Sequence, residues 1–253
     1  MLAPLGLQLW SIRDILEVDF KSGIQKIAKM GYAGVEPAGF PGITPGEAGK
    51  LFKEFGLVVP SIHEFPIPDK ERKNQLLETL EAVDCKCIVS GADDDADFRT
   101  VARIQRVCDK FNEASGLFAS YGITIGVHNH CSEFLKVDHR YAYEIMLEYL
   151  VPEIFFQVDT YWVKVAGVDP VEVVKRLGER APLLHIKDGP GKENKPQLAL
   201  GEGVMDIPAI VREGSDTVKW LIVELDDCAT DMLKAVKKSY QYMVSNNLAH
   251  GRL

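Results

Sequence analysis

The sequence lacks the features that would assign it to a membrane or to the secretory pathway. No apolar run reaches the roughly 18 residues that a membrane-spanning helix needs. The N-terminal stretch M-L-A-P-L-G-L has neither the charged start nor the cleavage site of a signal peptide. We therefore expect a soluble, cytoplasmic protein with no membrane partner.

Paired cysteines and an excess of basic residues are also missing. The chain has five cysteines and no C-x-x-C spacing, so neither a disulfide framework nor a zinc ribbon is expected. The 29 Lys and Arg are outnumbered by 37 Asp and Glu, which gives a formal net charge of −8. Because nucleic-acid binding needs clustered positive charge, we expect a small-molecule partner and no nucleic acid.

No linker or low-complexity segment divides the chain, so residues 1–253 are expected to form one domain. Short apolar runs typical of strands alternate with amphipathic stretches of helical period. The predicted strands are 5–10, 34–36, 58–63, 87–90, 123–128, 154–159, 182–187 and 220–225. The predicted helices are 19–30, 46–55, 70–83, 97–121, 139–149, 170–178 and 229–246, with a long polar loop over 189–206 before a short helix.

This alternation predicts an α/β fold, a single-domain (β/α)8 TIM barrel. Strands that are apolar throughout and separated by helices indicate a parallel sheet buried on both faces. Eight such units in about 250 residues fit a closed barrel. The alternative, a doubly wound open sheet, usually has a glycine-rich phosphate-binding turn after its first strand, and the segment Q-L-W-S-I-R-D has none.

Metal-ligand residue types follow the last four predicted strands. Glu133 comes shortly after the fifth, Asp159 closes the sixth, His185 lies in the seventh and Glu224 in the eighth. In a parallel barrel the carboxyl ends of all strands meet at one mouth. Two Glu, one Asp and one His suit a divalent cation with open positions, namely manganese, cobalt, magnesium or zinc. The pattern therefore predicts a metal-assisted enzyme.

Other interpretations of these residues stay open. Asp159 could cap the following helix, and a lone His such as His185 is more often a hydrogen-bonded core residue. The fifth strand is ambiguous, because strand alternation places His128 and His130 on one face. Either His could ligate a metal in place of Glu133, or His128 could act as a base while Glu133 reaches back to the metal.

Aromatic residues and a further histidine are candidates for substrate contact. Trp10, Trp162 and Phe65 could form an apolar wall for a sugar, although packing between loops is the alternative. His63, in S-I-H-E-F, could act as an acid, a base or a hydroxyl contact. Its alternative is a strand-end His bonded to the backbone. His130 could contact substrate if it is not a ligand.

Two charged residues complete the predicted substrate contacts. Glu36, which ends the second strand, could accept hydrogen bonds from substrate hydroxyls or pair with Arg13. Lys187 shares a strand face with His185 and could stabilise developing oxyanion charge. It could instead form an ion pair with Asp188 or Asp226.

Eight motifs carry a resemblance over nearly the whole chain: Q-L-W-S-I-R-D, G-Y-A-G-V-E-P, S-I-H, G-V-H-N-H-C-S-E-F, V-D-T-Y-W, L-L-H-I-K-D, L-G-E-G-V-M-D and V-E-L. In their order they resemble the xylose isomerase-like TIM barrel superfamily, the sugar phosphate isomerase/epimerase group that includes AP endonuclease family 2. The resemblance implies a metal held by residues of strands five to eight, here Glu133, Asp159, His185 and Glu224. Many relatives have Glu where His128 stands, so this chain departs at the first ligand.

A cation bound to adjacent oxygens of a hydroxy-ketone acidifies the neighbouring C–H and stabilises an enediolate. Glu133 and Glu224 are candidates for moving the proton on the two faces of the substrate, with His128 and His63 as further acid or base groups. The predicted function is a metal-dependent sugar, inositol or keto-sugar isomerase or epimerase. A dehydratase (lyase) is the alternative. An endonuclease IV-like repair enzyme and a non-catalytic sugar-binding barrel fit less well, and a homo-oligomer is compatible with the sequence.

Overall fold

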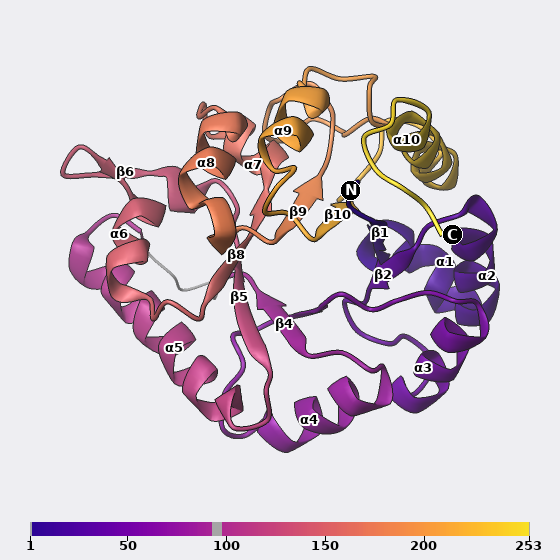
Figure 1. The fold of residues 1–253 in the computed structure, drawn as a ribbon, viewed down its shortest axis with the longest axis horizontal. Helices are drawn as coiled ribbons and strands as arrows, with labels where there is room; N and C mark the ends of the chain where they lie inside the picture. Colours follow the sequence, from indigo (N-terminus) through magenta and orange to yellow (C-terminus); the bar gives the residue numbers. More distant parts are fainter. Residues whose placement is uncertain (1, 93–97, 253) are drawn as a thin grey trace.

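The computed structural model describes residues 2–92 and 98–252, and its centre is a barrel of eight parallel strands (Figure 1). The strands are β1 (Leu5–Gln8), β2 (Gly34–Glu36), β3 (Ile62–Glu64), β4 (Cys87–Ser90), β5 (Thr124–His128), β8 (Phe155–Asp159), β9 (Leu183–Ile186) and β10 (Trp220–Val223). They pair in the order β2-β1-β10-β9-β8-β5-β4-β3. A bridge between Gly34 of β2 and Val58, which precedes β3, brings the first and last strands of this order next to each other. The predicted single-domain TIM barrel is confirmed.

Helices surround this barrel on the outside (Figure 1). They are α2 (Phe20–Met30), α3 (Pro45–Glu54), α4 (Lys73–Ala82), α5 (Val101–Ala119), α6 (Ala142–Tyr149), α8 (Pro170–Leu177), α9 (Ile207–Glu213) and α10 (Met232–Ser245). In α2, Asp19 caps the first turn and Gly31 ends the helix at φ 104°, a backbone angle that favours glycine. In the parts of the chain that the structure describes, no helix is long and apolar enough to cross a membrane.

Short elements occupy the loops between strands and helices. They are α1 (Arg13–Val18), α7 (Thr160–Val165), the 3-10 turns η1 (Leu9–Ile12), η2 (Ser132–Phe134) and η3 (Gly178–Arg180), and the hairpin of β6 (Lys136–Val137) with β7 (Arg140–Tyr141). Because the hairpin extends to Tyr141, α6 begins at Ala142, whereas the sequence predicted a helix from residue 139. Likewise β3 begins at Ile62, four residues later than predicted, because Pro60 has no N–H to donate to a ladder. Residue 97 of the predicted fourth helix lies outside the described residues.

Strand alternation changes the barrel interior from apolar to charged along its axis. In β8 the buried residues Phe155, Gln157 and Asp159 share one face, since side chains repeat every second residue. Leu183 and His185 follow the same order in β9. Phe155, Leu183 and Val89 form a separate apolar cluster. Buried polar groups therefore gather toward the carboxyl ends of the strands, where the loops open.

Candidate metal centre and substrate cavity

Four buried side chains from adjacent strands converge inside the barrel mouth. His128, Asp159, His185 and Glu224 each offer one ligand atom, and these atoms all lie within 4.8 Å of one another. His128 ends β5, Asp159 ends β8, His185 lies in β9 and Glu224 directly follows β10. Since β5, β8, β9 and β10 are consecutive in the sheet, the barrel itself positions the four groups.

Glu133 is not a member of this cluster. It lies in η2, five residues beyond the end of β5, and its Oε2 accepts hydrogen bonds from the backbone N–H of His130 at 2.9 Å and the hydroxyl of Ser132 at 3.0 Å. Oε2 therefore bonds to its own loop, whereas Oε1 is buried and makes no hydrogen bond, and burial raises the pKa of this carboxyl. Glu133 as the first ligand therefore stays a prediction; in the cluster that the structure brings together, His128, the alternative kept open, supplies the fourth donor.

Asp159 uses its two oxygens differently. Oδ1 accepts the backbone N–H groups of Tyr161 and Trp162, each at 3.0 Å, and so caps α7. Oδ2 is buried, makes no hydrogen bond and faces the Nζ of Lys187 at 2.9 Å. Burial raises the pKa of this carboxyl, and Lys187 offsets that rise only in part. Asp159 can therefore cap α7 through Oδ1 and ligate a metal through Oδ2, because Oδ2 is the oxygen that faces the cluster.

His185 lies between two carboxylates. Its Nδ1 is 2.7 Å from Oε2 of Glu224 and its Nε2 is 2.9 Å from Oε1 of Glu36. Burial alone would lower the pKa of His185, but the two carboxylates outweigh it and raise the pKa to about 10. The ring is thus an imidazolium here, and ligating a metal requires one nitrogen to give up its proton. Glu36 is the outer partner that holds the ring through Nε2.

Glu36 supports the cluster from beneath. It is fully buried and accepts hydrogen bonds from Gln8 at 2.6 Å, from the Ser61 hydroxyl and from Gln157. Burial would raise the pKa of Glu36, but the charge and hydrogen bond of His185 outweigh it and lower the pKa to about 2.

The alternative pairing of Glu36 with Arg13 does not form; the Arg13 guanidinium lies 4.5 Å from the ring centroid of Trp10. The Glu36 side chain has no exposed surface and does not line the cavity, so the geometry does not favour a direct contact with substrate hydroxyls.

Gln157 determines which nitrogen of His128 is free. A carboxylate can only accept, so the amide nitrogen of Gln157 faces Glu36 and its Oε1 faces His128 Nδ1 at 3.0 Å. Nδ1 must then carry the proton, which leaves the lone pair on Nε2, 3.8 Å from Asp159 Oδ2. Burial and the nearby His185 lower the pKa of His128 well below its usual value. His128 is therefore neutral, with one nitrogen free to ligate.

Lys187 provides the cation at the centre of the acidic groups. Its Nζ lies 2.9 Å from Asp159 Oδ2, 2.7 Å from Glu224 Oε2 and 2.8 Å from Asp226 Oδ2. Burial would lower its pKa, but the three carboxylates raise the pKa well above the usual value. Of the two predicted ion pairs, the one with Asp226 forms. Asp188 instead accepts backbone N–H groups of residues 189–205 and fixes that loop.

A cavity of about 400 Å³ opens above the cluster. His128 and Glu224 reach its lining, together with the predicted contact residues Trp10, His63 and His130. Asp159, His185 and Lys187 are almost completely buried below. Of the remaining candidates, Phe65 lines the rim and Trp162 lies beside His130, with 6.3 Å between ring centroids.

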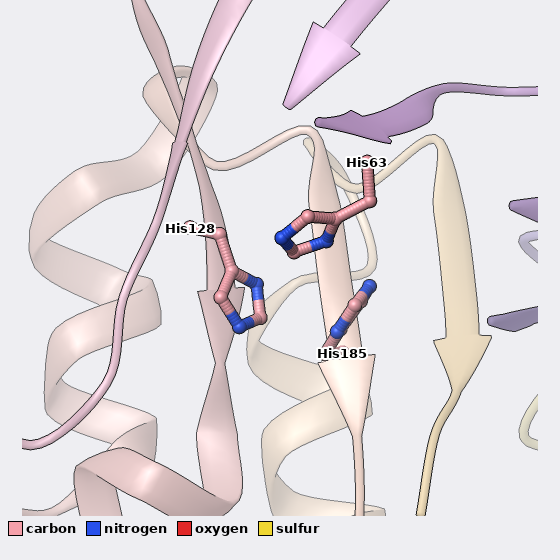
Figure 2. Close-up of side chains that lie close together, drawn as sticks. All are labelled: His63, His128 and His185. Carbon is pink, nitrogen blue, oxygen red and sulfur yellow. The ribbon is translucent and has the colours of Figure 1, made fainter. Parts of the chain in front are cut away.

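The three imidazoles of His63, His128 and His185 are turned toward one another from β3, β5 and β9 (Figure 2). The ring centroid of His63 is 4.8 Å from that of His128 and 6.2 Å from that of His185. Its buried Nδ1 makes no hydrogen bond to the backbone and lies 3.6 Å from Oε1 of Glu36. The ring lines the cavity, with its Nδ1 side turned toward Glu36.

Sequence reasoning missed Gln157 and the backbone support of Asp159. Asn129 donates to Asp159 O at 3.2 Å and accepts from Asp159 N at 2.9 Å, which joins the ends of β5 and β8. The available signal was a polar residue, Gln157, inside an apolar strand and in phase with Asp159.

Comparison with known proteins gives a family and several similar folds. Residues 24–244 match the model of the family described as xylose isomerase-like TIM barrel. No curated protein sequence matches the chain. A sugar phosphate isomerase/epimerase from Parabacteroides distasonis is 24% identical, with a TM-score of 0.82 over 98% of this chain and 96% of that one.

Two further solved structures are similar over nearly their full length. The probable 3-DHS dehydratase from Bacillus anthracis is 16% identical, with a TM-score of 0.77 over 95% of this chain and 98% of that one. The IOLI protein with a bound zinc atom is 14% identical, with a TM-score of 0.75 over 96% and 97%. At these identities the likeness establishes the fold alone.

Proposed function

Because the chain belongs to the xylose isomerase-like TIM-barrel family, whose matching region spans residues 24–244, we propose that it is a divalent-metal-dependent isomerase or epimerase of a keto-sugar or related polyol. The observation that carries this proposal is the set of four ligand atoms within 4.8 Å of one another at the floor of a cavity. A buried site that gathers ionisable groups in this way is typical of catalysis.

The donor set supports a divalent cation. His128 offers a neutral imidazole with Nε2 free, and Asp159 offers a buried oxygen that makes no hydrogen bond and is ion-paired with Lys187 at 2.9 Å. His185 and Glu224 complete a mixture of nitrogen and oxygen donors that suits manganese, cobalt, magnesium or zinc. A zinc atom in a similar fold is consistent with this assignment. When bound, such an ion would polarise a substrate carbonyl and stabilise the negative charge that develops on its oxygen.

Proton transfer is assigned to residues that reach the cavity. Glu224 is assigned the proton from the substrate carbon because it is a carboxylate in the cavity lining. Burial would raise its pKa, but Lys187 and His185 lower it, which keeps the group ionised and weakens it as a base. His63 comes from β3, apart from β10, and lines the cavity; because its Nδ1 faces Glu36, its other ring nitrogen, Nε2, is assigned the exchange of a proton with the substrate from another side. The neutral His128 reaches the cavity and can orient the substrate, while the Lys187 ammonium, buried below it, favours negative charge at the floor.

Deuterium exchange tests the proposal. The protein, loaded with each of the four metals in turn, is incubated with keto-sugars and inososes in D₂O, and deuterium at the carbon next to the carbonyl is followed by NMR. We expect exchange with the wild type and a loss of at least about 100-fold in His63→Gln, which should retain its metal. The Glu224→Gln variant should lose exchange altogether. Undiminished exchange in Glu224→Gln would contradict its role.

Dehydration is the second candidate, since loss of a hydroxyl next to the acidified carbon follows from the same proton abstraction. A similar fold is described as a probable dehydratase. Product analysis separates the two reactions, because an isomerase or epimerase conserves mass and a dehydratase releases water.

A further inference from the structure

A second cavity adjoins the first at the barrel mouth. It has a volume of about 350 Å³ and shares Trp10, Ala38 and Gly39 with the cavity above the metal cluster. Trp10 lies in η1 after β1, and Gly39 follows β2, so the two loops next to each other in the barrel form the boundary. Each cavity alone falls in the range of small-molecule sites, about 300–1,000 Å³. The pair is therefore larger than one sugar ring requires.

The boundary residue is an aromatic side chain held in place but not covered. The indole of Trp10 is 46% exposed although it is large and apolar. The guanidinium of Arg13 lies 4.5 Å from its ring centroid, and this guanidinium also donates to the Trp10 carbonyl at 2.9 Å. The stack fixes the ring and leaves much of its apolar surface open. A fixed, exposed aromatic ring suits the flat apolar face of a sugar or an aromatic ring.

Charge around the two cavities does not favour a phosphate group. Among the described residues, no Lys or Arg lines the first cavity, whereas Glu64, Glu224 and Asp226 do. In the second cavity Arg13 is accompanied by Glu17. A phosphate dianion needs cationic or N–H donors, and the nearest cations are already paired with the lining carboxylates: Arg72 with Glu64, and Lys187 with Glu224 at 2.7 Å and Asp226 at 2.8 Å. The lining therefore suits a neutral, hydroxylated ligand.

We infer that the substrate is an unphosphorylated glycoside: its keto-sugar ring occupies the metal cavity and its second ring occupies the cavity between Trp10 and Phe40. This inference rests on the proposed function for the first ring only. Phe40 and Pro41 form the outer wall of the second cavity and do not line the first. Trp10 contacts both rings, and the linking oxygen lies beside Gly39, where even an added Cβ would meet nothing within 4 Å.

Binding of matched ligands tests the second cavity directly. Isothermal titration compares the methyl glycoside with the phenyl glycoside and the disaccharide in the gluco, galacto and manno series, and adds the 6-phosphate of each methyl glycoside. We expect at least one two-ring ligand to bind about tenfold or more tightly than its methyl partner, with no gain from phosphate. The phenyl and disaccharide arms show whether the second ring is aromatic or a sugar.

Three variants at two positions, Phe40 and Trp10, locate the two-ring preference. Phe40→Ala should bring the two-ring preference close to unity while leaving the affinity for the methyl glycoside within about twofold. Trp10→Phe should keep the preference and Trp10→Ala should lose it. Val204→Ala alters an exposed apolar residue that lines neither cavity and is the control. Circular dichroism of each variant confirms folding.

Equal affinity for one-ring and two-ring ligands in every series would overturn the inference. So would a preference that persists in both Phe40→Ala and Trp10→Ala, or tighter binding of a 6-phosphate. Deuterium exchange is measured separately. Exchange without a two-ring preference would contradict binding in the second cavity, and a two-ring preference without exchange would contradict the proposed reaction.

Discussion

Lys187 Nζ lies 2.9 Å from Asp159 Oδ2, the buried carboxylate oxygen that makes no hydrogen bond. The same ammonium is 2.7 Å from Glu224 Oε2. Two of the proposed metal ligands therefore already face a cation that belongs to the chain. A divalent ion binds such oxygens at about 2.0–2.2 Å, so it must compete with this ammonium, which can still pair with Asp226 at 2.8 Å.

Removing the Lys187 charge should therefore tighten metal binding. In Lys187→Met we expect the Kd for divalent ions to fall about tenfold or more, since no cation then competes for the carboxylates. The metal-free variant should lose about 3–5 kcal/mol of unfolding free energy, because three acids lose their counter-charge. Calorimetric titration and urea unfolding measure both effects. Lys187→Arg keeps the charge and serves as the control; an unchanged or weaker Kd in Lys187→Met would contradict the competition.

Two substitutions of Asp159 should separate its role as a metal ligand from its role as the N-cap of α7. Asp159→Asn retains an oxygen that can cap α7 but loses the charge, so metal binding should disappear with little change in the cap. Asp159→Ala should lose the cap as well, at a further cost of about 0.5–2 kcal/mol. Asp169→Ala is a matched control, since Asp169 caps α8 through Val171 N at 2.9 Å and is not part of the cluster. That control should lose stability and retain the metal; metal loss there would show that capping alone governs binding.

The sequence predicted the barrel and three members of the cluster for the same physical reason. Apolar strands between amphipathic helices fix the order of the elements, and Asp159, His185 and Glu224 lie in or directly beside a strand. Their direction therefore follows from the period of two. Glu133 lies five residues beyond β5, where a 3-10 turn decides its direction, and strand periodicity does not extend to it. His128, at the strand end itself, was the residue that periodicity could place.

Contacts across the barrel were beyond sequence reasoning. Glu36 and His185 are 149 positions apart and meet only because the strand tilt and stagger of the barrel bring β2 and β9 together inside it. The same holds for Glu36 and Gln157, which are 121 positions apart. Without that geometry, an acid at the end of β2 looks like a substrate contact, although the fold buries it as a support.

Gln157 should control metal affinity through His128. Gln157→Leu removes the acceptor that holds the proton on Nδ1, so we expect metal affinity to fall about 10–100-fold. Gln8→Leu is the matched control, because Gln8 also donates to Glu36 but makes no contact with His128. Metal titration of both variants under the same conditions distinguishes the two explanations. Equal losses of metal affinity would show that the effect acts through Glu36 and not through the orientation of His128.

The Glu36–His185 pair should give the metal-free protein a defined pH dependence. His185 has a folded pKa of about 10 against 6.5, so its stabilisation is full below pH 6.5 and is lost as the pH rises through about 10. Glu36 has a folded pKa of about 2 against 4.5, so its stabilisation is present above pH 4.5 and is lost as the pH falls through about 2.

The unfolding free energy in the presence of a chelator should therefore be highest, for this pair, between about pH 4.5 and 6.5. Glu36→Gln should lower it there by about 3–5 kcal/mol and flatten the alkaline decline. Urea titrations from pH 4.5 to 9.5 provide the profile. Parallel curves for the wild type and Glu36→Gln would show that the pair does not govern this dependence.

The most direct test of the metal centre is calorimetric titration of the metal-free chain with manganese, cobalt, magnesium and zinc, combined with elemental analysis. The account predicts a single divalent ion per chain in the wild type, loss of that ion in His128→Ala, and its retention in Glu133→Ala. Absence of binding by every metal, or binding that needs Glu133 and not His128, would contradict it.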